Sequence, residues 1–356
     1  MWGAKDGYES GCGWRAPSAK CWAREPNGGN VELPRALITG ISGFAGPYLA
    51  ACLGAQNIEC AGISREPTIA SHPVSLRGLR IHDVDIRDRE ALRKVLSDEK
   101  PDWVFHLAAI THVASSRTKP DLVFDVNVAG TFNLLEGLRQ VGHAARVVFV
   151  SSGNLYGNVD SGEEGFSEES PVRPGSPYAT SKLMGEELVR SYVEDFGLAV
   201  TIARPFNHTG PGQPPSFVCP EFARAIAAGV ARGEKHVEMK TGLLEPRRDI
   251  SDVRDVVRAY ALLAERGRPG EVYNVCSGSM VSMAEVVKML AELAHVEVTT
   301  ELDAAKVRER EIMRSGGNCG KIRRELGWEP KIPLQDTLES LLDYWVREAL
   351  PAGQPE

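Results

Sequence analysis

The chain has 356 residues, of which 42% are hydrophobic and 25% are charged, and its formal net charge is −7. This composition is that of an ordinary soluble globular protein, and the length is sufficient to bury a large core. The negative charge excludes polyanion binding by the protein as a whole, so we expect no nucleic-acid partner. No run of about 18 apolar residues occurs, and we therefore expect no membrane-spanning helix.

The N-terminal segment 1–32 combines glycines, charged residues and single aromatic residues without a periodic pattern. It predicts a flexible leader, and it lacks the apolar stretch that a signal peptide needs. The seven cysteines are scattered and lie mostly inside apolar runs. That distribution favours reduced thiols and a cytoplasmic protein over a disulfide framework. Cys12 and Cys21 have no second pair at ligand spacing, so we expect no metal site.

From Pro34 onward, short apolar runs alternate with helical patterns. Strands are expected at 35–40, 58–64, 79–86, 102–109, 145–152 and 198–207. Helices are expected at 46–55, 88–100 with Asp88 as N-cap, 123–142 and 177–197. Because parallel neighbours need a crossover, which these helices supply, the pattern predicts an α/β fold with a Rossmann-type doubly wound parallel sheet.

After Asn207 this rhythm breaks at a Gly/Pro-rich loop over 208–216, and later segments are shorter and mixed. We expect a smaller mixed α/β C-terminal lobe that covers the carboxyl ends of the strands, where ligands bind in open α/β sheets. The run "EVYNVCSG" predicts a strand that returns to the main sheet. The expected domains are the Rossmann domain over 33–207, to which 248–278 return, and a substrate-binding lobe over 208–247 and 279–350.

The stretch "TGISGFAG" places three glycines between the first strand and the first helix. One glycine permits a tight turn, one lets the backbone approach a pyrophosphate, and one lets the helix pack closely on the sheet. The free N–H groups of the helix then face negative charge, so the pattern predicts a dinucleotide site. The expected contacts are Gly40, Ser42, Gly43, Phe44, Ala45 and Gly46.

The end of the second strand bears on the choice of cofactor. NAD sites usually carry an acid there, but this chain has Ser64 and Arg65. Arginine pairs with a 2′-phosphate, so we predict NADP, with NAD as the alternative if Arg65 is a solvated surface residue. Asp85 and Ile86, in "HDVDI", are expected at the adenine.

The stretch "SPYATSK" places Tyr178 and Lys182 four residues apart, on one face of a helix. A nearby ammonium stabilises a phenolate and is expected to lower the tyrosine pKa. Ser152, at the end of the fifth strand, is positioned to hold a substrate oxygen. Together these three residues predict an acid/base unit that moves a proton on a carbonyl or alcohol while hydride is exchanged with a nicotinamide.

The motifs "TGxxGFxG", "HLAA", "SSxxxYG" and "YxxxK" together resemble the extended short-chain dehydrogenase/reductase family, from residue 35 to about residue 345. The segments "RPFNHTGPGQ", "RRDISDVRD" and "YNVCSG" resemble its branch that acts on sugars derived from GDP-mannose. The resemblance implies a homodimer that pairs the helices after the fourth and fifth strands. It also implies further cofactor contacts at Leu107, Ala108, Ala109, Pro205 and His208.

The segment "SSGNLYG" departs from the dehydratases of this branch, which read "STSELYG". Asn154 stands where they carry a glutamate base, and an amide cannot remove a proton from the sugar. The resemblance therefore implies reduction of an existing ketone. NADPH would reduce C4 of GDP-4-dehydro-6-deoxy-D-mannose to give GDP-D-rhamnose, with Tyr178 as proton donor. A role for Asn154 as a turn residue leaves the loss of the base unaffected.

A nucleotide sugar carries two phosphate charges, which arginine binds well. By resemblance, Arg248 and Arg308 would hold the diphosphate and Glu311 would reach the nucleotide ribose. A solvated charged surface is the alternative for such arginines. The resemblance places these further residues at the substrate: Asn207, Val218 and Arg224.

Three other functions remain open at this point. A nucleotide-sugar 4-epimerase would use the same three residues but would be better suited to tightly held NAD. A GDP-mannose 4,6-dehydratase would need the missing base. A non-catalytic NADP-binding sensor or scaffold would have no need for a lysine beside the tyrosine.

Overall fold

The computed structural model describes residues 34–65, 72–307 and 311–350. Three sequence-based predictions fall outside these ranges: the leader over 1–32, the Cys12–Cys21 pair and Arg308.

The larger part of the molecule is built on a parallel sheet of seven strands. The strands are β1 (Arg35–Thr39), β2 (Glu59–Ser64), β3 (Arg80–Asp83), β4 (Trp103–His106), β5 (Arg146–Val150), β6 (Ala199–Pro205) and β10 (Val272–Val275). Their order is β10-β6-β5-β4-β1-β2-β3, and every neighbouring pair is parallel. The strand order reverses at β1, which confirms the predicted Rossmann-type doubly wound sheet.

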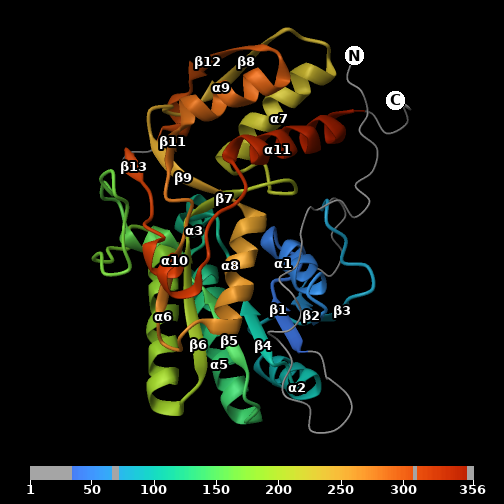
Figure 1. Ribbon diagram of the computed structural model, residues 1–356, viewed down its shortest axis with the longest axis vertical. Coiled ribbons are helices and arrows are strands. Elements are labelled where there is room, and N and C mark those ends of the chain that lie inside the picture. Colours follow the sequence, from blue (N-terminus) through green and yellow to red (C-terminus); the bar gives the residue numbers. More distant parts are fainter. Residues whose placement is uncertain (1–33, 66–71, 308–310, 351–356) are drawn as a thin grey trace.

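Helices cover both faces of this sheet. They are α1 (Ala45–Gly54), α2 (Arg89–Glu99), α5 (Gly130–Val141), α6 (Pro177–Phe196) and α8 (Val253–Arg266). α1 packs against α8 on one face, and α5 lies between α2 and α6 on the other (Figure 1). Successive strand residues point to opposite faces, so Ile38 joins the core under α1 and α8 whereas Leu37 joins the core under α2, α5 and α6.

The helix predicted over 123–142 is interrupted. After α3 (Val113–Thr118) and α4 (Pro120–Phe124), a π-helical turn (Asp125–Ala129) precedes α5. The Thr131 hydroxyl donates a hydrogen bond of 2.6 Å to the Asn127 carbonyl, and this contact competes with the regular backbone pattern. The helical register shifts by one residue at this point, as a π-bulge requires.

The smaller lobe contains helices and short strands. Its elements are β7 (Asn207–Thr209), α7 (Val218–Ala231), β8 (His236–Thr241), β9 (Arg247–Asp252), β11 (Met280–Ser282), α9 (Met283–Ala294), β12 (Glu297–Leu302), β13 (Arg314–Ser315) and α11 (Leu334–Ala349). The helix α10 (Gly320–Leu326) packs instead against β10 and α8 of the larger part. β9 pairs with β7, β11 and β13, whereas β8 pairs with β12. α7, α9 and α11 share a core (Figure 1). Among the described helices, none is long and apolar enough to cross a membrane.

Two boundaries differ from the sequence-based expectation. Because β9 belongs to the small sheet, the chain returns to the larger part at Val253, not at residue 248. The expected loop over 208–216 begins with part of the short strand β7, which pairs with β9. The strand predicted from "EVYNVCSG" does lie in the main sheet, as β10 beside β6.

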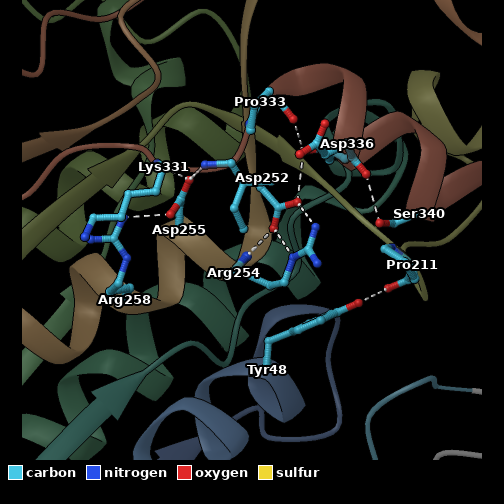
Figure 2. A network of polar contacts seen from close by, with 12 residues as sticks. Tyr48, Pro211, Asp252, Arg254, Asp255, Arg258, Lys331, Pro333, Asp336 and Ser340 are labelled. Carbon is cyan, nitrogen blue, oxygen red and sulfur yellow. Dashed lines mark hydrogen bonds and ion pairs between the residues drawn. The ribbon is translucent and has the colours of Figure 1, made fainter. Parts of the chain in front are cut away.

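The start of α8 joins the two parts of the molecule (Figure 2). The Asp252 carboxylate accepts the Arg254 N–H at 2.7 Å as helix N-cap, and the Thr337 hydroxyl of α11 at 2.9 Å. Asp255 accepts the backbone N–H of Lys331 at 2.7 Å. These buried carboxylates are thus satisfied by groups from the smaller lobe, which fixes the lobe against the sheet.

Candidate active site

A cavity of about 570 Å³ lies between the strand ends of the larger sheet and the smaller lobe. Its lining comes from the loop after β1, the ends of β2, β4, β5 and β6, the start of α6, and parts of α7 and β9. The cavity brings together these residues predicted from the sequence: Gly40, Ser42, Gly43, Phe44, Ala45, Gly46, Arg65, Asp85, Ile86, Leu107, Ala108, Ala109, Ser152, Tyr178, Lys182, Pro205, Asn207, His208, Val218 and Arg248.

The glycine loop forms the floor of one end of the cavity. Gly40 has a φ of +70°, and an added Cβ would lie 2.8 Å from the Ala108 backbone. At Gly46 an added Cβ would lie 2.2 Å from the Ile41 carbonyl oxygen. No other residue fits these two positions, because each glycine lies directly against a neighbouring backbone. The backbone is therefore exposed to the cavity just where α1 begins and its first N–H groups lack helical partners.

Beside this loop, the end of β2 is polar and carries no acid. The Ser42 and Ser64 hydroxyls are hydrogen-bonded to each other. The Arg65 side chain is 58% exposed and its guanidinium lies 4.0 Å from the Asp85 carboxylate. Arg87 donates hydrogen bonds of 2.7 and 3.0 Å to Asp85 and thereby lowers the pKa of that carboxyl. Two guanidinium groups thus lie near one carboxylate, which leaves the local charge positive.

The start of α6 fixes the position of Tyr178. Ser176 caps this helix by accepting the Ala179 N–H at 3.1 Å, and Pro177 occupies the first helical turn. Lys182 follows one turn later, and its ammonium donates a 2.8 Å hydrogen bond to the Val150 carbonyl of β5. Tyr178 and Lys182 are both buried, at 6% and 3% exposure.

Ser152 lies two residues beyond β5. Its hydroxyl accepts the Asn154 N–H at 3.1 Å and begins a short 3₁₀ turn (Gly153–Tyr156). A hydrogen bond from Ser152 also acts on the Tyr178 phenol. The serine, tyrosine and lysine therefore meet at one point of the cavity wall, as the sequence predicted.

The charges in this cluster depend on burial. Burial raises the pKa of the Tyr178 phenol, and the Ser152 hydrogen bond only partly opposes that rise. Burial also lowers the pKa of Lys182 to about 8, against the opposing effect of the Glu186 carboxylate. The expectation that Lys182 lowers the Tyr178 pKa is therefore wrong for this structure, because burial of the phenol outweighs other effects.

Sequence reasoning missed Asn127, in the π-helical turn. Its side-chain oxygen accepts the Ile110 N–H at 2.8 Å, and its NH₂ donates to the Ile110 carbonyl at 3.1 Å and to the Ser181 hydroxyl at 2.9 Å. Asn127 thus ties the loop after β4 to α6. A helical pattern in the sequence does not reveal a π turn, so no local signal marked this residue.

His106, the last residue of β4, is a buried core residue. Its two ring nitrogens are hydrogen-bonded to Thr39 and Thr131, at 2.8 and 3.0 Å. Complete burial lowers its pKa to about 3, so this ring is neutral.

At the other end of the cavity, Arg248 of β9 faces the space between the two parts. It donates hydrogen bonds to Glu311 at 2.6 Å and to the Ile312 carbonyl at 2.7 Å. Glu311 does not line the cavity but holds Arg248 in place. Arg224 does not line the cavity either: it is exposed on α7, and its guanidinium lies 6.0 Å from the Trp345 ring centroid.

Residues 37–341 match the family model described as GDP-mannose 4,6 dehydratase. The chain belongs to the GDP-mannose 4,6-dehydratase family. Over 311 residues it is 36% identical to GDP-6-deoxy-D-mannose reductase of Pseudomonas aeruginosa, a match that covers 87% of this chain and 97% of that protein. This finding confirms the relationship that the sequence motifs predicted.

Two solved structures agree with this placement in the family. The structure of RMD from Pseudomonas aeruginosa complexed with NADPH has a TM-score of 0.78 and 34% identity, and the match covers 89% of this chain and 98% of that one. The structure of Thermus thermophilus UDP-glucose 4-epimerase complexed with NAD has a TM-score of 0.76 and 32% identity, and the match covers 87% of this chain and 98% of that one. The same fold thus serves both nicotinamide cofactors in these relatives.

Asn154 bears on whether the cavity wall contains a carboxylate base, which a 4,6-dehydration needs. Asn154 lines the cavity two residues after Ser152, and its side chain is exposed. Among the described residues that line the cavity, Asp85 is the one carboxylate, and it lies at the opposite end beside the glycine loop, paired with Arg87. In the described part of the chain, the cavity wall near Tyr178 therefore offers no carboxylate base.

Proposed function

We propose that this family member reduces the C4 ketone of GDP-4-dehydro-6-deoxy-D-mannose with NADPH and forms GDP-D-rhamnose. The observation that carries the proposal is the cluster of Ser152, Tyr178 and Lys182 in a cavity wall where Asn154 replaces a carboxylate. A proton donor is present for the reduction, and the base that a dehydration needs is missing. The similarity to GDP-6-deoxy-D-mannose reductase supports the same choice.

The residues at the glycine loop fit NADPH. The close backbone approaches at Gly40 and Gly46 hold the glycine loop and the first N–H groups of α1 at the cavity, where they suit a diphosphate. The Arg65 guanidinium suits a 2′-phosphate, so NADPH is the expected cofactor and NAD the alternative. Bound NADPH supplies a hydride. Asp85 and Ile86 would contact the adenine, whereas Leu107 to Ala109, Pro205 and His208 would line the path towards the nicotinamide.

In this reaction Ser152 donates a hydrogen bond to the ketone oxygen and orients it. Tyr178 transfers its proton to the oxygen as negative charge develops there. Because burial favours the neutral phenol, Tyr178 carries that proton at neutral pH and is ready to act as an acid. Lys182, held at the Val150 carbonyl, supplies positive charge beside the tyrosinate that remains.

The smaller lobe would bind the GDP part of the substrate. Arg248, aligned by Glu311, would contact the diphosphate, and Asn207 and Val218 would line the sugar and nucleotide sides. The predicted roles of Arg308 at the diphosphate and Glu311 at the ribose remain proposals, and Arg308 lies outside the described residues. Arg224 is not part of this proposal, because it lies on the outer side of α7.

We also propose a homodimer formed by α5 and α6. Their outer surface carries three large apolar side chains, Phe132, Met184 and Phe196, which are 38%, 44% and 51% exposed. Replacing Phe196 by Glu should shift the mass measured by light scattering from dimer to monomer.

The free state of the described cysteines supports a cytoplasmic location.

The proposal is tested by following NADPH absorbance with GDP-4-dehydro-6-deoxy-D-mannose, with the dTDP-linked keto sugar as a matched comparison. Rapid oxidation with the GDP-linked sugar is expected, and NMR should identify the product as GDP-D-rhamnose. A 4-epimerase, which the structural likeness to UDP-glucose 4-epimerase keeps as the second candidate, would interconvert sugars without net NADPH consumption. A dehydratase would form a keto sugar from GDP-mannose and NADP, and a sensor would give no turnover at all.

A further inference from the structure

Glu186 is a buried carboxylate on α6, one turn beyond Lys182, and its side chain is 0% exposed. One oxygen accepts hydrogen bonds from the Ser151 hydroxyl at 2.6 Å and from Nε of Arg204 at 2.8 Å. The other oxygen accepts from Arg204 at 2.6 Å and from Arg190 at 3.2 Å. A carboxylate buried so deeply requires partners of this kind, because an unpaired buried charge is costly.

Arg204, in β6, connects this carboxylate to the neighbouring strands. Its side chain is 3% exposed, and its second terminal nitrogen donates to the Tyr156 hydroxyl at 3.1 Å. Tyr156 in turn donates to the side chain of Asn274, in β10, at 2.7 Å. The network therefore joins the carboxyl ends of β5, β6 and β10 beneath the cavity floor.

Helix α6 forms hydrogen bonds with two successive residues at the end of β5. Lys182 bonds to the Val150 carbonyl, and Glu186 bonds to the Ser151 hydroxyl. Residues four apart lie on one face of a helix, so both contacts come from the face of α6 that meets the sheet. Ser152 is the next residue, so its position relative to Tyr178 is set by these two contacts.

We propose that Glu186, paired with Arg204, is a positioning residue for the reduction: it fixes the Ser151–Ser152 end of β5 against α6 and places a carboxylate one helical turn from Lys182. This inference rests on the roles proposed above for Ser152, Tyr178 and Lys182. Glu186 touches neither substrate nor cofactor and acts through its neighbours. Nothing in the sequence marked it, since a glutamate in a helix usually faces solvent.

The electrostatic part of the proposal follows from the groups around Lys182. α6 contributes Tyr178 and Glu186, β4 contributes the neutral His106 ring, and β5 contributes the Phe149 ring, 5.3 Å from the ammonium. On β6, the Arg204 guanidinium is paired with Glu186 at 2.6 Å. Among the groups that act on the Lys182 pKa, Glu186 is the one that raises it, against burial, which lowers it to about 8.

The sign of the expected pH effect follows from this balance. Lys182 acts as a cation, so activity is lost as the pH rises through its pKa. Removing the Glu186 charge should lower that pKa further and move the basic limb of kcat/KM to lower pH, by about one unit. At pH 8 a shift of one unit cuts the protonated fraction from about one half to about one tenth, so kcat/KM should fall about fivefold more there than at pH 6.

The main experiment compares Glu186→Gln, Glu186→Asp and the control Arg190→Gln over pH 6 to 10. Glu186→Asp keeps the charge but withdraws it from Ser151, so kcat should fall while the basic limb stays in place. Glu186→Gln should lower kcat and also displace the limb. Arg190→Gln removes an outer partner of Glu186 and should leave both unchanged. A limb that stays in place in Glu186→Gln would contradict the electrostatic part of the proposal.

A paired variant guards against loss of folding. Glu186→Gln leaves Arg204 as a buried cation, whereas Glu186→Gln combined with Arg204→Met removes both charges and keeps the volume. The double variant should fold, as judged by its circular dichroism and NADPH binding, and should still show the displaced limb. A double variant with the wild-type kcat and pH profile would overturn the proposal.

A readout without turnover separates this inference from the proposed function. Trace acetylation by acetic anhydride, quantified by mass spectrometry of the peptide that carries Lys182, gives the pH midpoint of that amine. We expect a midpoint near pH 8 in the wild-type protein, a lower one in Glu186→Gln and no change in Arg190→Gln. If the protein failed to oxidise NADPH with the GDP-linked ketone but this shift appeared, the proposed function would be wrong while the control of Lys182 by Glu186 held. An unchanged midpoint would contradict that control.

Discussion

The wall of the cavity that comes from the larger sheet is set by backbone approaches and buried side chains, whereas the wall from the smaller lobe includes a charged side chain, Arg248, that an ion pair orients. Gly46 lies directly against the Ile41 carbonyl, and Lys182 is buried and held by a strand carbonyl. On the other wall, Arg248 is oriented by Glu311, and β9 carries it between short strands. On the sheet side, adding a single carbon atom to a glycine should therefore lower stability and cofactor binding. On the lobe side, removing the charge of Arg248 should weaken substrate binding.

The largest effect should come from Tyr178→Phe, on the sheet side. The variant lacks the proton donor, so kcat should fall about 10²- to 10⁴-fold. NADPH affinity should remain, because the ring still fills its place. Stopped-flow NADPH oxidation and a fluorescence titration measure the two quantities.

Tyr192→Phe is the matched control on the same helix. Its hydroxyl donates to Glu136, away from the cavity, so kcat should be unchanged and stability should fall by about 1 kcal/mol. Equal losses of kcat in the two variants would show that Tyr178 does not have a special role.

Gly46→Ala tests whether backbone approach sets the cofactor wall. The added Cβ would lie 2.2 Å from the Ile41 carbonyl oxygen, so the free energy of unfolding should fall by about 1–3 kcal/mol and NADPH binding should weaken. Thermal unfolding with and without NADPH gives both quantities.

Gly54→Ala, in the last turn of α1, supplies the comparison. Its added Cβ would meet nothing within 4 Å, so this variant should be as stable as the wild type, or more stable by up to about 1 kcal/mol. Equal destabilisation by both substitutions would mean that the close approach at Gly46 is not what matters.

Arg248→Gln probes the charged wall. Loss of a charge-assisted hydrogen bond to a phosphate should raise KM for the GDP-linked ketone about 10- to 100-fold, with a much smaller change in kcat. Arg224→Gln, on the outer side of α7, should leave KM unchanged in the same steady-state assay. If the Arg224 variant had the larger effect, the substrate would have to lie elsewhere on the lobe.

The smallest effect is expected from Arg65→Ala. Its side chain is 58% exposed and partly screened, so kcat/KM with NADPH should fall about tenfold while the value with NADH stays constant. Parallel assays with the two cofactors measure the ratio. An equal loss with both would remove Arg65 from the choice of cofactor.

The sequence predicted most of the sheet-side wall because its signals are local. The glycine spacing determines a loop, the Ser176–Pro177 pair determines where α6 begins, and four residues later Lys182 follows Tyr178 on the same face. Each of these relations spans only a few residues. These relations do not depend on contacts with distant segments of the chain, so short motifs were enough to predict them.

The features of the site that the short motifs did not predict depend on contacts between segments that are distant in the sequence. Asn127 bonds to Ile110, which is 17 residues away, and Arg248 bonds to Glu311, which is 63 residues away. Arg224 was assigned by resemblance, yet the buried neighbours Ala223 and Ile226 already define the inner side of α7 and place it outside. The pKa of Tyr178 rises instead of falling because its direction is set by burial, which no local spacing reveals.

The central claim is that this protein reduces a GDP-linked 4-keto sugar, and it is tested most directly by one NADPH-oxidation assay with GDP-4-dehydro-6-deoxy-D-mannose. We expect rapid oxidation by the wild-type protein, little with the dTDP-linked ketone, and almost none by Tyr178→Phe. An absence of NADPH oxidation by the wild-type protein, together with formation of a keto sugar from GDP-mannose and NADP, would contradict the claim and would mean that dehydration proceeds without a carboxylate at Asn154.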